Sequence, residues 1–102
     1  MTLNRYARKR DANEAEIVAA LEAAGCSVLR VDPVDLIVGR RYKDFTGGFG
    51  FWRDTNFLLE VKLPGAKLNK RQKALHESWR GQIAVVETVE QALVAVGVKE
   101  AP

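Results

Sequence analysis

One stretch decides the fold of this 102-residue chain: Phe57-Leu58-Leu59-Glu60-Val61-Lys62. It predicts a short β-strand, because apolar and β-branched residues surround a single acidic position and Pro64-Gly65 break the chain just beyond it. Side chains alternate along a strand, so Glu60 and Lys62 are expected on the same face. Charged groups inside an apolar strand are costly to desolvate. The pair therefore indicates either a functional site or a structural ion pair on a solvent-facing strand.

Six further elements are predicted around this strand. Strands are expected at residues 27–31, 35–39 and 83–86, where short apolar runs lie between glycine, proline and polar residues. Helices are expected from Asp11 to Gly25, from Asn69 to about Trp79, and from Thr88 to Gly97, each with apolar residues at helical spacing or a capping pattern. Three capping boxes are predicted: Asp11 with Glu14, Asn69 with Gln72, and Thr88 with Gln91. The order helix, three strands, helix, strand, helix indicates an α/β domain.

The connection between the second and third strands is unusual in composition. Residues 40–56 hold five of the eight aromatic residues beside three glycines, so a long hairpin with a glycine-rich tip is expected. Its aromatic rings could stack on unpaired bases or wedge open a junction, and packing against a dimer partner is an equal alternative. The segment Gly47-Gly48-Phe49-Gly50 is not a phosphate-binding loop, since neither the lysine nor the following helix of such a loop is present.

The charge pattern favours a nucleic-acid partner. The formal net charge is +3 and the pI is about 9.2, with basic residues gathered in two segments. One is an N-terminal arm, residues 1–10, with Arg8, Lys9 and Arg10; the other includes Lys67, Lys70 and Arg71. Such clusters suit contacts to backbone phosphates, although a solvated charged face is the simpler interpretation of each one alone.

Composition excludes several other classes. Cys26 is the only cysteine, which excludes an intramolecular disulfide and a cysteine metal knuckle. No apolar run follows the basic N-terminus, and no stretch approaches the roughly 20 apolar residues needed to span a bilayer. We expect a cytoplasmic protein, in a bacterial or phage-infected cell.

Two acidic residues inside apolar strands predict a metal site. Pairing the strands that carry Asp35 and Glu60 would bring two carboxylates together, and these repel unless a cation lies between them. Mg²⁺ is commonly held by one or two carboxylates plus substrate phosphate. Lys62 would then orient the attacking water or stabilise charge on the phosphate.

These residues resemble the PD-(D/E)XK nuclease superfamily. Pro33-Val34-Asp35 followed after a gap by Glu60-Val61-Lys62, within this order of elements, carries the resemblance. More narrowly, the chain is similar to archaeal Holliday-junction resolvases, through Glu14, Ile17-Val18 and Gly25. It is also similar to small phage nucleases of the VRR-NUC kind, through Leu68 to Gln72, His76, Trp79-Arg80-Gly81-Gln82 and Val85-Val86. The similarity spans residues 11–97, and the hairpin at 40–56 is longer than expected for the phage branch.

The resemblance implies a fold and an activity. The fold would be a restriction-endonuclease-like αβββαβ core with a mixed four-stranded sheet flanked by helices. The activity would be Mg²⁺- or Mn²⁺-dependent endonucleolytic hydrolysis of DNA phosphodiesters, selective for junction, flap or other branched DNA, in a homodimer. Residues 11–97 would be the nuclease domain, with the hairpin as an insertion and residues 98–102 as a tail. The alternatives are a non-catalytic nucleic-acid-binding domain of the same fold, or an RNA-processing nuclease.

The resemblance also assigns roles. The implied metal ligands are Asp35, Glu60 and the backbone carbonyl of Val61, with Lys62 assisting the attacking water. Glu14, which shares a helical face with apolar residues, would be a third acidic catalytic group. Glu16 and Gln72 are candidate accessory residues, and Gln72 is equally explained as a capping residue. His76, the only histidine, is expected at a surface or interface rather than as a general base.

Overall fold

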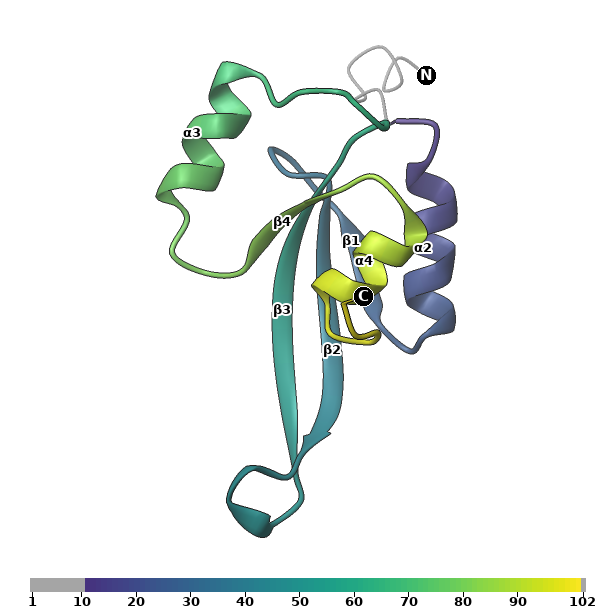
Figure 1. Cartoon of the computed structure of the whole chain (residues 1–102), viewed down its shortest axis with the longest axis vertical. Helices are drawn as coiled ribbons and strands as arrows, with labels where there is room; N and C mark the ends of the chain where they lie inside the picture. Colours follow the sequence, from purple (N-terminus) through teal and green to yellow (C-terminus); the bar gives the residue numbers. More distant parts are fainter. Residues whose placement is uncertain (1–10, 102) are drawn as a thin grey trace, which may run out of the picture.

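A mixed four-stranded sheet organises residues 11–101, the part of the chain that the computed structural model describes (Figure 1). Its strands are β1 (Ser27–Arg30), β2 (Leu36–Asp44), β3 (Phe51–Val61) and β4 (Ile83–Val86), in the spatial order β1-β2-β3-β4. The pairs β1–β2 and β2–β3 are antiparallel, and β3–β4 is parallel. The predicted α/β class with a mixed four-stranded sheet is confirmed. The predicted basic arm, with Arg8, Lys9 and Arg10, lies outside the described residues.

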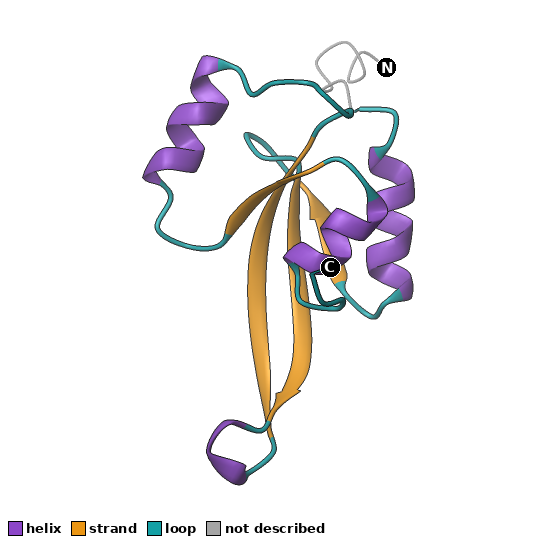
Figure 2. Ribbon diagram, in the orientation of Figure 1, coloured by secondary structure: helices purple, strands orange, loops and turns teal. Residues whose placement is uncertain are grey.

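Three α-helices accompany the sheet in the described range: α2 (Glu14–Ala23), α3 (Lys70–Ser78) and α4 (Val89–Ala95). Figure 2 shows α2 and α4 together on one side of the strands and α3 apart from them on the other. The helix α3 lies in the crossover between the parallel strands β3 and β4, a connection that parallel pairing requires. None of the helices in residues 11–101 is long and apolar enough to cross a membrane.

The apolar core lies between the sheet and the pair α2 and α4. The register Leu36↔Leu59 and Val38↔Phe57 aligns buried side chains on one face of β2 and β3. Burial of each such aliphatic side chain stabilises the fold by about 1.5–3 kcal/mol. The helices and β4 complete this core with Ile17, Val18, Leu21, Val86, Ala92 and Val96. Because side chains alternate, Glu60 lies on the opposite face of β3 from the core residues Leu59 and Val61.

The beginning of α2 differs from the prediction. The N-cap is Asn13, not Asp11, and no side chain caps the helix, so the expected Asp11–Glu14 capping box is wrong. The Asn13 amide Nδ2 donates instead to the backbone oxygens of Lys62, at 3.0 Å, and Glu87, at 2.7 Å. Asn13 therefore joins the start of α2 to the ends of β3 and β4. The other end of α2 follows the prediction, since Gly25 adopts a left-handed φ of 92° there.

The hairpin between β2 and β3 is longer and more regular than expected. The predicted strands at 35–39 and 57–62 proved too short at their hairpin ends, because the antiparallel ladder continues to Asp44↔Phe51. A 3₁₀ turn, Thr46–Gly48, closes it, and Gly47 and Gly48 have φ of 84° and 91°. These left-handed conformations are open to glycine at little steric cost. The prediction of a long hairpin with a glycine-rich tip is confirmed.

The predicted caps of the last two helices are largely confirmed. At α3 both bonds of the Asn69–Gln72 capping box are present, and the helix ends at Ser78, one residue before Trp79. At α4 the Thr88 hydroxyl accepts from Gln91 N. The reciprocal bond differs, since the Gln91 side chain accepts from the N–H of Glu87 rather than from Thr88.

Candidate functional site

Two carboxylates meet where β2 begins and β3 ends. The register Leu36↔Leu59 places Asp35, the residue before β2, beside Glu60 near the end of β3. The Asp35 N–H donates to the Leu59 carbonyl at 3.2 Å, and Asp35 Oδ2 accepts from the Val61 N–H at 2.7 Å. Asp35 is only 5% exposed. The backbone of β3 thus fixes the carboxylate next to the residue that the sequence pattern singled out.

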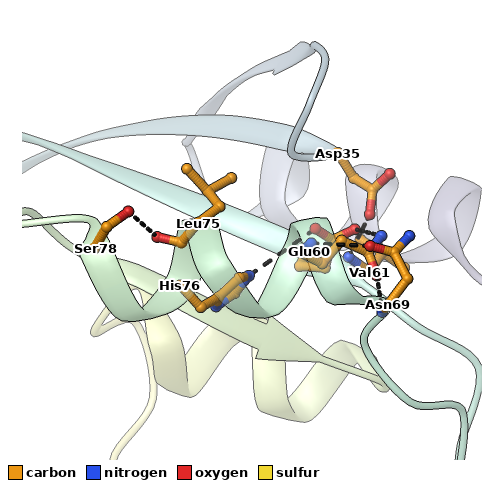
Figure 3. A network of polar contacts seen from close by, with 8 residues as sticks. Asp35, Glu60, Val61, Asn69, Leu75, His76 and Ser78 are labelled. Carbon is orange, nitrogen blue, oxygen red and sulfur yellow. Dashed lines mark hydrogen bonds and ion pairs between the residues drawn. The ribbon is translucent and has the colours of Figure 1, made fainter.

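Glu60 receives its side-chain neighbours from α3. Its Oε2 accepts from Gln72 Nε2 at 3.3 Å, and its Oε1 lies 3.9 Å from His76 Nε2 (Figure 3). The residue is 0% exposed although it lies on the sheet face away from the apolar core. A fully buried carboxylate is costly to desolvate unless polar groups surround it. The polar residues of α3 supply part of that environment.

Gln72 combines the two roles that the sequence offered as alternatives. Its side-chain Oε1 accepts from Asn69 N at 2.8 Å, while its own N–H donates to Asn69 Oδ1 at 2.9 Å, which completes the capping box. The remaining amide group, Nε2, donates to Glu60. The helix cap therefore fixes the side-chain orientation that presents a donor to the carboxylate.

His76 is mostly buried within the chain, where a position at a surface or interface was expected. Its side chain is 14% exposed and points to Glu60 from one turn beyond Gln72. Burial lowers its pKa below the ordinary value of 6.5, because the charged imidazolium is poorly solvated there. A distance of 3.9 Å is too long for a hydrogen bond and lies at the limit for an ion pair. His76 is therefore a close neighbour of Glu60 but not its hydrogen-bond partner.

The two glutamates of the first turn of α2 lie in different environments. Glu14 is buried and accepts from Arg30 Nε at 3.0 Å, whereas Glu16 is exposed. In residues 11–101 no three histidine, cysteine or acidic side chains form a group that could hold a metal. The structure thus brings Asp35 and Glu60 together and holds Glu14 in an ion pair with Arg30. Arg30 was not among the residues predicted from the sequence.

Lys62 follows directly on the end of β3 and is anchored through its backbone. Its N–H donates to the Val86 carbonyl at 3.0 Å, and its carbonyl accepts from Asn13. The peptide groups on both sides of Lys62 are therefore tied to neighbouring elements, while the residue itself is half-buried. Asn13 was also missed, since its partners lie 49 and 74 residues away in sequence.

The predicted phosphate-contacting residues in the described range are all exposed. Lys67 lies between β3 and α3, and Lys70 and Arg71 lie in the first turn of α3. Arg71 also borders a hollow of about 380 Å³, together with Asp32, Pro33, Asn69, Gln72 and Leu75. Gln72 reaches from this hollow to Glu60. Arg71 of the basic segment therefore borders the same hollow as Gln72, which contacts Glu60.

The donor set suits a hard divalent cation. Asp35 and Glu60 place carboxylate oxygens at neighbouring strand positions, and the Val61 peptide lies beside both. Mg²⁺ prefers oxygen ligands and completes its octahedron with waters and substrate phosphates, so two protein carboxylates are sufficient. The geometry is thus compatible with a metal that is completed by substrate. Comparisons of this chain with protein-family models, with curated proteins and with solved structures gave no match.

Proposed function

We propose that this chain is a metal-dependent DNA endonuclease with a restriction-endonuclease-like αβββαβ core of the PD-(D/E)XK kind. The observation that carries the proposal is the meeting of Asp35 and Glu60 on adjacent strand ends. The Val61 N–H holds the first carboxylate, and Gln72 holds the second. The sequence of elements from α2 to β4 is compatible with such a core.

The construction of α3 supports a site rather than a purely structural role. No residue of this helix is buried, so α3 adds little to the apolar core. Its Gln72 and His76 side chains approach a carboxylate instead. Ionisable groups that burial and polar neighbours perturb gather at functional sites. A helix that presents polar side chains to a buried carboxylate is therefore expected beside an active site.

Each residue then has a role in hydrolysis. Asp35, Glu60 and the Val61 carbonyl would hold Mg²⁺ or Mn²⁺, which when bound acidifies a water and stabilises charge on the phosphate. Lys62 supplies a cation that orients the attacking water or stabilises the phosphate oxygens. Gln72 orients the Glu60 carboxylate through its hydrogen bond. Asn13 and β4 fix the backbone from which the Lys62 side chain extends.

Branched DNA is the proposed substrate class. The exposed residues Lys67, Lys70 and Arg71 would contact backbone phosphates, which position DNA without reading its sequence. Selectivity would then follow from the shape of the substrate. A junction with twofold symmetry suits a symmetric dimer, in which each copy presents one site to one strand.

The test is a cleavage assay with a matched variant pair. Wild type is incubated with four-way junction, flap, linear duplex, single-stranded DNA and single-stranded RNA, in Mg²⁺, Mn²⁺ or EDTA. Glu60→Gln removes the charge at the site, and Glu90→Gln removes an exposed charge on α4, where Glu90 pairs only with Lys99 at 3.3 Å within the described residues. Metal-dependent cutting of branched DNA by wild type and Glu90→Gln, and none by Glu60→Gln, is expected. Equal cutting by Glu60→Gln, or no cutting by wild type, would refute the proposal; cutting of RNA alone would replace the substrate class.

A further inference from the structure

The outer part of the β2–β3 hairpin, residues 40–55, extends away from the rest of the sheet and is called the hairpin arm below (Figure 1). Several aromatic side chains are exposed on it, including Trp52 at 64% and Phe49 at 80%. Phe45 and Phe51 are exposed as well. Exposed aromatic rings at this density are unusual on a free surface and mark a contact site.

Cationic side chains lie over these rings. The Lys43 ammonium is 5.6 Å from the centroid of the Trp52 ring and 5.9 Å from that of Phe45, and the Arg53 guanidinium is 4.9 Å from Phe51. Arg53 is neutralised by Asp44. Lys43 has no carboxylate within ion-pair distance in residues 11–101. Lys43 and Trp52 together therefore present a positive charge beside an exposed aromatic plane.

The arm carries this pair on the same sheet face as the candidate site. Lys43 and Trp52 are direct partners across the ladder. Trp52 and Glu60 are separated by an even number of residues in β3, so the alternation of side chains places them on the same face of the strand. The direction of this face rotates gradually along the strand because the sheet is twisted. Eight residues of strand at about 3.3 Å per residue separate them by about 26 Å.

We propose that the hairpin arm binds an unpaired base of the nucleic acid substrate, stacked on Trp52 with Lys43 near its phosphate, about 26 Å along β3 from the phosphodiester at Glu60. The position relative to Glu60 rests on the proposed function; the stacking contact does not. Grooves that bind single strands combine stacking aromatics with cations in this way, and they tolerate any sequence because every base has a π face. A second copy of this chain fits less well, because the cores of interfaces between protein chains are depleted of charged residues.

Binding is measured in EDTA, so that cleavage plays no part. Fluorescence anisotropy of labelled single-stranded, flapped and blunt duplex DNA is compared for wild type, Trp52→Ala and Lys43→Met. Trp79→Ala is the matched control, since Trp79 is the only other tryptophan and is also exposed, at the end of α3. Trp52→Ala is expected to weaken binding of single-stranded and flapped DNA by between about fivefold and 150-fold, which corresponds to the loss of one stacked base. Blunt duplex affinity and the Trp79→Ala variant should change less than about twofold.

A second readout reports on the ring itself. In a Trp79→Phe chain, Trp52 is the only tryptophan, and its emission should be quenched when single-stranded DNA is added, but not when blunt duplex is added. Trp52→Phe, which keeps a smaller ring, should restore part of the affinity that Trp52→Ala loses.

Three results would overturn the inference. The first is that Trp52→Ala binds single-stranded DNA as tightly as wild type does. The second is that Trp52→Ala loses equal affinity for single-stranded and duplex DNA, and the third is that Trp52→Ala without DNA sediments more slowly than wild type while its DNA affinity is unchanged. The last would identify a contact between copies of the chain. Failure of the nuclease proposal can be distinguished from failure of this inference. If wild type cuts no substrate and still binds single-stranded DNA through Trp52, the nuclease proposal is refuted and the binding role of the hairpin arm stands.

Discussion

The carboxylate of Asp35 accepts a 2.7 Å hydrogen bond from the backbone N–H of Val61, the residue that follows Glu60. One acidic side chain of the candidate site is therefore bonded to the peptide group next to the other. A shift of the end of β3 would move both carboxylates together. The bond also satisfies a buried N–H, which links the site to the stability of the sheet.

Asp35→Ala should lower the free energy of unfolding by about 1–3 kcal/mol, because it leaves the buried Val61 N–H without its acceptor. Asp35→Asn keeps an oxygen acceptor and should lose less. Urea denaturation measures both values, with Asp54→Ala as the control because Asp54 is exposed on the hairpin arm. Equal stability of Asp35→Ala and wild type would show that the bond contributes nothing.

Divalent metal should raise the melting temperature of wild type, because a ligand that binds only the folded state stabilises it by mass action. With metal at about 100 times its Kd, the gain is about 2.7 kcal/mol. Asp35→Asn and Glu60→Gln should show no rise, since each lacks one of the two carboxylates. Thermal denaturation in Mg²⁺, Mn²⁺ and EDTA measures this, and a rise of equal size in the variants would place the metal elsewhere.

Substitutions at Gln72 and Asn69 distinguish the contribution of the helix cap from that of the contact with Glu60. Asn69→Ala removes the Oδ1 acceptor of the cap and should cost about 1 kcal/mol of stability. It keeps the backbone N–H of residue 69 that orients the Gln72 side chain, so the Gln72 amide stays near Glu60. Gln72→Ala removes the side-chain bonds of Gln72 to the Asn69 N–H and to Glu60. It should also slow cleavage about tenfold, the scale typical of residues that orient a metal ligand. Cleavage rates normalised for folded protein distinguish the two. An equally slow Asn69→Ala would mean that the cap alone positions the site.

His76 gives a pH dependence with a defined sign. Burial lowers its pKa in the folded state below 6.5, so at pH values just under 6.5 the unfolded chain binds a proton that the folded chain does not. The stability contributed by the neutral ring is therefore complete above pH 6.5 and falls as pH decreases through this range. NMR titration of the His76 ring should give a pKa below 6.5, and His76→Gln should flatten the stability profile. A ring pKa above 6.5 would mean that attraction to Glu60 outweighs burial.

Local sequence rules predicted the elements whose determinants lie close together in the chain. Asn69 and Gln72 predicted a capping box because both partners are within one helical turn. The strand Ile83–Val86 matched its prediction residue for residue, since a short apolar run before a polar cap leaves little freedom. The acidic residues were also found, because a carboxylate in an apolar strand stands out against its neighbours.

Long-range contacts explain what the sequence could not predict. Asp11 had the pattern of a cap, but the N-cap is Asn13, whose amide donates to the carbonyl groups of the residues just after β3 and β4. His76 was expected at a surface or interface. Its spacing one turn beyond Gln72 allowed it to face Glu60, but the choice between these positions depends on how α3 packs. The outer strands of the hairpin were expected only as parts of a long hairpin, and their bounds were not predicted because they lack buried positions. Pairs such as Arg41 with Asp54, not an apolar face, line the ladder there.

The regular ladder of the hairpin arm has a consequence for how its length can vary. Side chains alternate with a period of two, so inserting one residue in each strand would turn Trp52 and Lys43 to the opposite face. Insertions or deletions of two residues per strand would preserve the face and change the reach by about 6.6 Å. The arm lies outside the apolar core, so such changes would leave the core packing intact. Relatives or engineered variants with this arrangement should therefore differ in arm length by even numbers of residues per strand, so that the reach of the arm changes in steps of about 6.6 Å.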